Sequence, residues 1–298
     1  MKFGITGNLD KSEIPALVLA LIGVMQSHRV DFVLDDKLTR LLRKHLERQD
    51  QRKSISVPEN RLPDECDILV SLGGDGTILR AARLVGKHET PILAVNVGKL
   101  GFLAEVSQDE AAACLEEILA GKYKIEDRMM LVGSADGFKS TYSALNDIVI
   151  EKYGSSRMLT IETYVNEEYL ATYTADGIII ATPTGSTAYS LANSGPIVIP
   201  SSAAITINPI CPHTLTARPV IVPSNSVLVI KLPVAGQKLN LTADGQQARL
   251  LTSPASIRVK QAPYVARLVK RLNSNYYDVL RKKLHWGSDV RIRGKGKH

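Results

Sequence analysis

The amino-acid sequence predicts an α/β domain with a mostly parallel sheet, followed by a β-rich domain. Over about the first hundred residues, short apolar runs alternate with segments of helical periodicity, which is the βαβ order of a parallel sheet. From about Lys122 on, strand patterns separated by Gly and Pro favour antiparallel sheet. We therefore expect the α/β domain over residues 1–121, the β-rich domain over 122–270, and a helix with a basic tail over 271–298 that packs back on the first domain.

The first domain is expected to alternate strands and helices in chain order. Apolar runs predict strands at residues 3–6, 30–34, 68–72 and 92–95. Helical spacing of apolar residues predicts helices at 13–27, 38–49, 77–86 and 109–119, the last of them after Ser107 as a candidate N-cap.

The second domain is expected to consist almost entirely of strands. Alternating patterns predict them at residues 143–150, 159–165, 169–173, 177–181, 226–232, 239–242 and 256–260. One further helical pattern, at residues 274–284, follows this block and is the helix that we expect to pack on the first domain.

Composition and charge limit the possible classes of protein. The chain has 298 residues, 44% of them hydrophobic and 22% charged, which is ordinary for a globular protein and sufficient for two domains. The formal net charge is +7, with much of the excess in residues 281–298. A basic tail is usually a solvated segment, and since no recognisable nucleic-acid-binding motif accompanies it, we expect no nucleic-acid partner. A positive balance suits anionic ligands such as nucleotides.

The three cysteines, Cys66, Cys114 and Cys211, are far apart and show no CxxC spacing. This argues against both a disulfide framework and a zinc site, and it favours a reducing compartment. The sequence contains neither a signal-peptide core nor a run of about 18 uncharged apolar residues. We therefore expect a cytoplasmic protein without a membrane-spanning segment.

The sharpest local signal is a glycine-dense turn between an apolar strand and a helix. Residues 69–77 read Leu-Val-Ser-Leu-Gly-Gly-Asp-Gly-Thr, and ligands bind at such carboxyl ends of strands in open α/β sheets. The glycines let backbone N–H groups approach a phosphate, and the helix adds its positive end. Asp75 would repel a phosphate, so it is better suited to act as a base for a hydroxyl or as an anchor for magnesium. The alternative is a plain β-turn, because Asp-Gly recurs at Asp136, Asp176 and Asp244.

A second signal lies at residues 176–190, where a buried strand runs into a loop rich in Thr, Gly and Ser. Its hydroxyl and N–H groups could bind ribose and phosphate oxygens, or could merely cap a helix. Neither GxGxxG nor GxxxxGK[ST] occurs, so the common dinucleotide fingerprint and the P-loop are both absent.

These two signals and four further blocks resemble the NAD kinase family in their residues and in their order. The further blocks are Gly-Lys-Leu-Gly-Phe-Leu at 98–103, Ala-Leu-Asn-Asp at 144–147, Cys-Pro-His-Thr-Leu-Thr-Ala-Arg-Pro at 211–219 and Ala-Asp-Gly-Gln at 243–246. The resemblance covers nearly the whole chain. It implies phosphoryl transfer from ATP, accompanied by Mg²⁺ or another divalent cation, to the 2′-hydroxyl of the adenosine ribose of NAD, and it implies a homodimer or homotetramer.

The resemblance also implies which residues act. Asp75 corresponds to the catalytic base, and Phe102 with Leu103 would form a wall of the adenine pocket. The residues implied to contact NAD are Asp75, Gly76, Arg80, Phe102, Asn146, Asp147, Arg157, Asp176, Thr187, Ala188, Tyr189, Ser190, Leu191, Ala192 and Gln246. The sequence shows no obvious cluster of metal ligands, so the cation is expected to arrive mainly on the nucleotide.

Each of these residues also has an ordinary structural interpretation. Asn146-Asp147 and Asp176 could be turn residues, Arg80 and Arg157 solvated surface charges, and Phe102 part of a core. At the level of the whole protein, a lipid or sugar kinase with the same glycine-aspartate turn is one alternative, and a non-catalytic dinucleotide sensor on the same fold is another.

Overall fold

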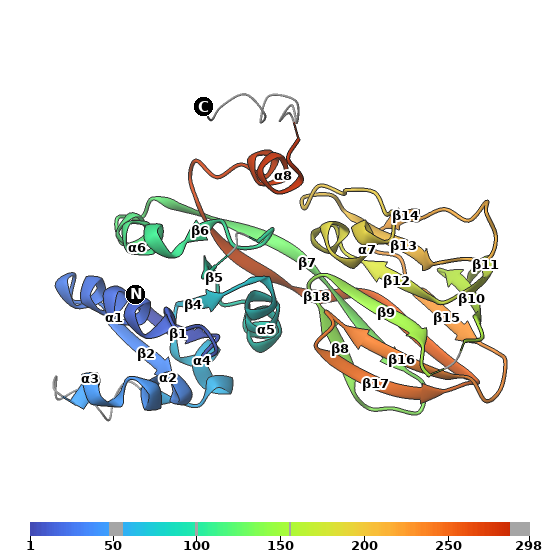
Figure 1. The fold of residues 1–298 in the computed structure, drawn as a ribbon, viewed down its shortest axis with the longest axis horizontal. Coiled ribbons are helices and arrows are strands. Elements are labelled where there is room, and N and C mark those ends of the chain that lie inside the picture. The colour runs from blue at the N-terminus through green and yellow to red at the C-terminus, as the bar shows by residue number, and fades with distance from the viewer. Residues whose placement is uncertain (48–55, 99–100, 155, 287–298) are drawn as a thin grey trace, which may run out of the picture. The chain divides into compact units, whose positions relative to one another are not determined.

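The computed structural model describes residues 1–47, 56–98, 101–154 and 156–286, and Figure 1 shows its elements. The chain divides into two compact units. Unit 1 holds Met1–Ile78, Thr90–Glu126 and the described residues from Leu268 on, and unit 2 holds Leu79–Glu89 and Asp127–Arg267. No helix within the described part of the chain is both long and apolar enough to cross a membrane.

Unit 1 contains a parallel sheet with the strand order β3-β2-β1-β4-β5 and the short strand β6 beside β5. The strands β1, β4 and β5 are buried along almost their whole length, which is why they read as continuous apolar runs. The bounds are β1 Lys2–Gly7, β2 Asp31–Asp35, β3 Ser56–Val57, β4 Ile68–Gly73, β5 Ile92–Asn96 and β6 Val106–Ser107.

Several helices of unit 1 pack apolar residues into one core. The helix α1 buries Leu21 and Ile22 there, and α6 buries Leu115 and Ile118. The helical elements are α1 Ile14–Ser27, α2 Asp36–Leu41, α3 Arg43–Glu47, η1 Glu59–Arg61, α4 Leu62–Glu65, η3 Gln108–Glu110, α6 Ala111–Leu119 and α8 Tyr276–Leu284. A further helix, α5 Asp75–Val85, begins in unit 1, and its residues from Leu79 on belong to unit 2 together with η2 Gly86–His88.

The single helix predicted at residues 38–49 is wrong. The chain instead forms α2 and α3, which are separated at Leu42, and residues 48–49 lie outside the described part. The first of these helices begins early because the Asp35 carboxylate accepts hydrogen bonds from the N–H groups of Lys37 and Leu38. Leu38 and Leu42 are buried at a spacing of four residues, and this periodicity had suggested one continuous helix.

Unit 2 consists mostly of antiparallel strands, of which β7 begins and β18 ends in residues of unit 1. One sheet has the order β14-β13-β12-β9-β16-β17. In the other, β10 pairs with β11 and β15, β15 pairs with β18, and β7 pairs with β8. One buried cluster holds Ile148 and Ile180 of the first sheet and Ile161 and Ile257 of the second, so both sheets share a core. The bounds are β7 Tyr123–Ala135, β8 Thr141–Ala144, β9 Asp147–Lys152, β10 Leu159–Val165, β11 Glu168–Ala175, β12 Gly177–Ala181, β13 Ala204–Ile210, β14 Val220–Pro223, β15 Leu228–Leu232, β16 Lys238–Ala243, β17 Gln247–Thr252 and β18 Ala255–Arg271.

The predicted fold class is confirmed: a mostly parallel α/β part comes first and a β-rich part follows, and α8 belongs to unit 1. Several strands were missed. The pattern of β13 is interrupted by the polar Thr206 and Asn208 and by Pro209, and yet all three are buried. The predicted strand 143–150 is in fact two strands with a break at Leu145 and Asn146.

Candidate active site

The glycine turn lies between β4, which ends at Gly73, and α5, which begins at Asp75. Gly73 has a φ of 156°, and a Cβ there would lie 2.3 Å from Oγ1 of Thr77, so only glycine fits. In contrast, a Cβ on Gly74 would meet no atom of the described residues within 4 Å. The turn is therefore tightly packed on one side and leaves room beside Gly74 for a ligand.

The Asp75 carboxylate is held by backbone amides from a distant part of the sequence. Oδ2 accepts a hydrogen bond of 2.9 Å from the N–H of Phe102, and Oδ1 accepts one of 3.2 Å from the N–H of Leu103. A Cβ on Gly101 would lie 1.8 Å from Oδ1, so a larger residue would occupy the place of the carboxylate. The glycine turn and the block at residues 98–103 thus meet at Asp75, although residues 99–100 lie outside the described part.

A second carboxylate, that of Asp244, organises the break between β8 and β9. Its oxygens accept hydrogen bonds of 2.9, 2.8 and 3.2 Å from the N–H groups of Leu145, Asn146 and Asp147. These bonds bring three backbone donors to one side chain, which explains why the chain does not continue as a single strand there. Asp244 itself has a positive φ of 53°, a conformation that aspartate tolerates in turns.

Asp147 is a buried carboxyl group, with 5% of its surface exposed. Burial, and then repulsion from Asp244, raises the pKa of Asp147 from its ordinary value of 3.8 to about 7. Burial also raises the pKa of Asp244, against the lowering effect of its backbone hydrogen bonds. Strongly shifted carboxyl groups of this kind cluster at functional sites.

The Thr/Gly/Ser loop lies beside these carboxylates in unit 2. Thr182 donates from Oγ1 to the carbonyl of Leu145 at 2.6 Å, and its N–H donates to the carbonyl of Asn146 at 2.8 Å. The loop continues as η4 Thr184–Thr187 and α7 Tyr189–Ala192. A cavity of about 480 Å³ lies there, lined by Asn146, Asp147, Val149, Glu151, Ala188, Tyr189, Asn240, Thr242, Asp244, Gly245 and Ala248.

The structure thus brings only some of the predicted residues together. Asn146, Asp147, Ala188 and Tyr189 line this one cavity within unit 2. The other predicted residues of this unit lie outside the lining so described: Arg80, Arg157, Asp176, Thr187, Ser190, Leu191, Ala192 and Gln246.

Several of these residues have other neighbours. Asp176 forms an ion pair of 2.6 Å with Lys152, and Arg157 lines a different cavity together with Lys152. Ser190 is buried, where its carbonyl and hydroxyl oxygens accept hydrogen bonds from Nδ2 of Asn208. Gln246 accepts a hydrogen bond of 2.9 Å from Arg83.

Sequence reasoning missed several residues at these sites. Asp244 was recognised as a turn residue and as part of the block at 243–246, but not as a site residue, although its carboxylate holds the Asn146-Asp147 segment. Asn208 anchors α7 but gave no signal, because it stands inside a strand. In unit 1, Lys283 of α8 places its Nζ 5.5 Å from the ring centroid of Phe102, a contact that no local pattern could reveal.

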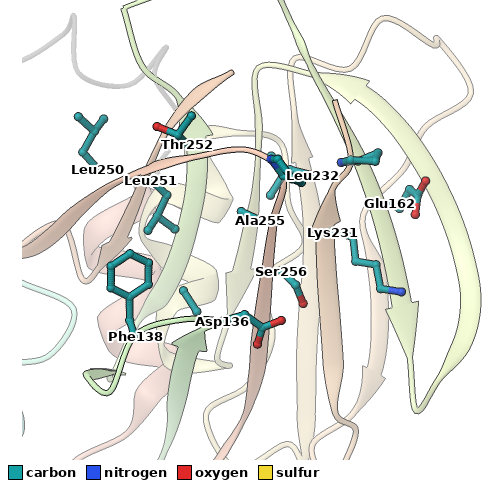
Figure 2. A pocket seen from close by; sticks show the side chains of 13 residues that line it. Asp136, Phe138, Glu162, Lys231, Leu232, Leu250, Leu251, Thr252, Ala255 and Ser256 are labelled. Carbon is teal, nitrogen blue, oxygen red and sulfur yellow. The ribbon is translucent and has the colours of Figure 1, made fainter. Parts of the chain in front are cut away.

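A larger cavity in unit 2 does not coincide with these groups. Figure 2 shows a cavity of about 660 Å³ in unit 2, with Phe138, Leu250 and Leu251 toward one end and Glu162 and Lys231 toward the other. Its described lining contains none of the predicted site residues. Cavity volume therefore does not point to the predicted residues, four of which line the smaller cavity beside Asp244.

Comparisons with known proteins agree with the sequence blocks. A family model described as the ATP-NAD kinase N-terminal domain matches residues 3–123, and one described as the C-terminal domain matches residues 145–271. The NAD kinase of Geobacter sp. (strain M21) is 43% identical over 256 residues, which cover 84% of this chain and 89% of that protein. The chain belongs to the NAD kinase family. The NAD kinase of Moorella thermoacetica is 39% identical and covers 96% of this chain and 90% of its own length.

Among solved structures, yeast NADH kinase complexed with NADH is similar to this NAD kinase family member. The TM-score is 0.89 at 28% sequence identity, and the match covers 98% of this chain and 89% of the yeast chain. The similarity therefore extends through both units, including the strands that sequence reasoning missed.

Proposed function

We propose that Asp75 is the base in the reaction of this NAD kinase, the phosphoryl transfer from ATP to the 2′-hydroxyl of the adenosine ribose of NAD. The observation that carries this proposal is the position of its carboxylate, at the carboxyl end of β4 and held by two backbone N–H groups. A carboxylate offers about four acceptor sites, so two amides leave room for a substrate hydroxyl.

Phosphoryl transfer passes through a loose transition state, so catalysis depends mostly on positioning and on neutralising charge. Asp75 orients the 2′-hydroxyl and accepts its proton late in the reaction. The open side of Gly74 and the N-terminus of α5 offer backbone N–H groups to the donor phosphates.

We propose that magnesium enters as part of the ATP substrate. Among the described residues, no group of three or more His, Cys, Asp and Glu side chains is placed to hold a metal ion. A magnesium ion bridging the phosphates would neutralise their charge without a dedicated protein cage.

The proposed NAD-binding residues are the predicted residues that line the 480 Å³ cavity of unit 2 and the further residues that the family resemblance adds. Asn146 and Asp147 provide an amide and a carboxyl group suited to ribose hydroxyls, and Tyr189 provides a ring. The other proposed contacts are Gly76, Arg80, Phe102, Arg157, Asp176, Thr187, Ala188, Ser190, Leu191, Ala192 and Gln246. A cytoplasmic location and a homodimer or homotetramer complete the proposal, on the family resemblance alone.

The test is NADP formation by the purified chain from NAD and Mg-ATP, detected with an NADP-specific dehydrogenase. Asp75→Asn should fold and bind NAD but lose about 10²- to 10⁴-fold in turnover, the usual contribution of a positioned base. Parallel assays with a lipid alcohol, a sugar and polyphosphate examine the alternative acceptors and donor. Wild-type turnover in Asp75→Asn would remove this residue from the role, and NAD binding without any turnover in the wild type would favour a dinucleotide sensor.

A further inference from the structure

Residues 101–105, which we call the strap segment, supply the two amides that hold Asp75. The N–H groups of Phe102 and Leu103 donate to the two carboxylate oxygens. The position of that carboxylate therefore depends on what fixes the strap segment from its other side.

On that other side lies Lys270, near the end of β18. Only 3% of its side chain is exposed, and its Nζ lies 2.5 Å from Oε1 of Glu105, which is 17% exposed. The same Nζ donates a hydrogen bond of 3.4 Å to the carbonyl oxygen of Leu103. The second carboxylate oxygen of Glu105 accepts a hydrogen bond from the hydroxyl of Ser274.

Both backbone polar groups of Leu103 thus form hydrogen bonds. Its N–H donates to Asp75 and its carbonyl accepts from Lys270. Glu105 adds a second attachment two residues further along the strap segment. A buried ammonium group paired in this way has few alternative positions, because leaving its carboxylate would strand a charge away from water.

We infer that Lys270 is a positioning residue for Asp75, acting through the strap segment. This inference rests on the proposed role of Asp75 as the base. The carboxylate must meet the 2′-hydroxyl at a fixed distance and angle, and displacement by about 1 Å can cost about 100-fold in rate. Removing the cation takes away the hydrogen bond to the Leu103 carbonyl and the ion pair of Glu105, so the two amides hold the carboxylate less firmly.

The neighbouring residue provides a matched control. Arg271 also ends β18 and also forms a close ion pair, 2.6 Å from Glu117 of α6. Arg271 forms ion pairs with Glu110 and Glu117, and both lie outside the strap segment. Arg271→Met therefore removes a cation and an ion pair of the same unit while leaving the contacts of Asp75 in place.

The experiment compares Lys270→Met, Arg271→Met and the double variant Lys270→Met/Glu105→Gln in steady-state NADP formation and in thermal unfolding. The double variant keeps the fold testable, because it removes both charges of the Lys270–Glu105 pair together. We expect kcat to fall about 10- to 100-fold in both Lys270 variants, with KM for NAD within about 3-fold of the wild type. Arg271→Met should keep kcat within about 2-fold.

The decisive comparison is between the single and the double Lys270 variant. The double variant should regain thermal stability relative to Lys270→Met without regaining kcat. If kcat returns together with stability, Lys270 is a structural residue only and the inference is wrong. Asp75→Asn is assayed alongside: unchanged turnover there would overturn the proposed base itself, whereas loss there with normal kcat in both Lys270 variants would overturn only the inference.

Discussion

The two units hold aspartates of the same chemical type in different physical settings. Asp75 in unit 1 is half-buried, and both of its carboxylate oxygens accept backbone hydrogen bonds. Asp147 in unit 2 is almost fully buried, and its pKa is raised to about 7, mainly by burial and further by Asp244. Surroundings, not residue type, therefore separate the carboxylate that we propose as the base from a carboxyl group whose pKa lies near neutral pH.

Asp244 shows a third setting for the same side chain. It holds three consecutive N–H groups and so gives the Asn146-Asp147 segment its shape. Single substitutions can disturb each of these three environments separately.

The largest effect is expected from Gly101→Ala. The new Cβ would lie 1.8 Å from Oδ1 of Asp75 and would displace the carboxylate, so kcat should fall about 10³-fold, as after loss of the base. Gly23→Ala is the control, because a Cβ there meets nothing within 4 Å and α1 should tolerate it. Normal kcat in Gly101→Ala, measured by NADP formation, would show that the position of Asp75 does not matter.

Asp244→Ala should have the next largest effect. It leaves three backbone donors without their acceptor, so we expect a loss of about 2–3 kcal/mol in unfolding free energy and a lower Tm. Asp244→Asn keeps one acceptor oxygen, and asparagine tolerates the positive φ, so the loss of unfolding free energy should be smaller in this variant. Equal Tm values for the two variants, measured by calorimetry, would contradict the role of the carboxylate as an acceptor.

A smaller effect is expected in the pH dependence of NAD binding. Asp147 gains its negative charge as the pH rises through about 7, and an ionised carboxylate accepts hydrogen bonds from ribose hydroxyls better than a neutral one. The affinity for NAD should therefore increase by up to about tenfold from pH 6 to pH 8, in line with one titrating group. In Asp147→Asn this increase should disappear when Kd is measured by titration calorimetry at both pH values.

The same group should affect stability in the opposite direction. The pKa of Asp147 is higher in the folded state than its ordinary value of 3.8. Its contribution to the free energy of unfolding is therefore fully present below about pH 4 and is lost as the pH rises through about 7. The Asp147→Asn variant does not titrate at this position and so does not lose this stability. The Tm of the variant minus the Tm of the wild type should therefore increase from pH 5 to pH 8. A difference in Tm that is constant with pH would contradict the shifted pKa.

Much of the fold could be predicted because the decisive signals are local. The runs that form β4 and β5 are buried on both faces, so they are apolar along their length, and they give the parallel part of the fold directly. The missed strand β13 carries Thr206 and Asn208, whose burial depends on partners elsewhere in the chain. The break between β8 and β9 depends on Asp244, 97 to 99 residues away in sequence.

The candidate functional residues also divide into those that a local sequence pattern shows and those that only the structure shows. Asp75 and the Asn146-Asp147 pair stand in short recognisable blocks, so the sequence could point to them. Lys270 acts on a segment 165 to 167 residues away, and a lone lysine in a strand carries no local signal of that contact. Asp244 was recognised as a turn residue, which its positive φ supports, but its three hydrogen bonds required the structure.

The most direct test of the contrast between the two aspartates is to measure kcat and the Kd for NAD in Asp75→Asn and Asp147→Asn at pH 8. Asp75→Asn should lose about 10³-fold in kcat with Kd within about 3-fold of the wild type, the pattern of a group that acts mainly in the transition state. Asp147→Asn should weaken Kd about tenfold with kcat changed only a few-fold. Full kcat in Asp75→Asn would contradict the proposal that this aspartate acts in the chemical step. A loss of about 10³-fold in the kcat of Asp147→Asn, with its Kd for NAD unchanged, would contradict the proposal that Asp147 acts in binding.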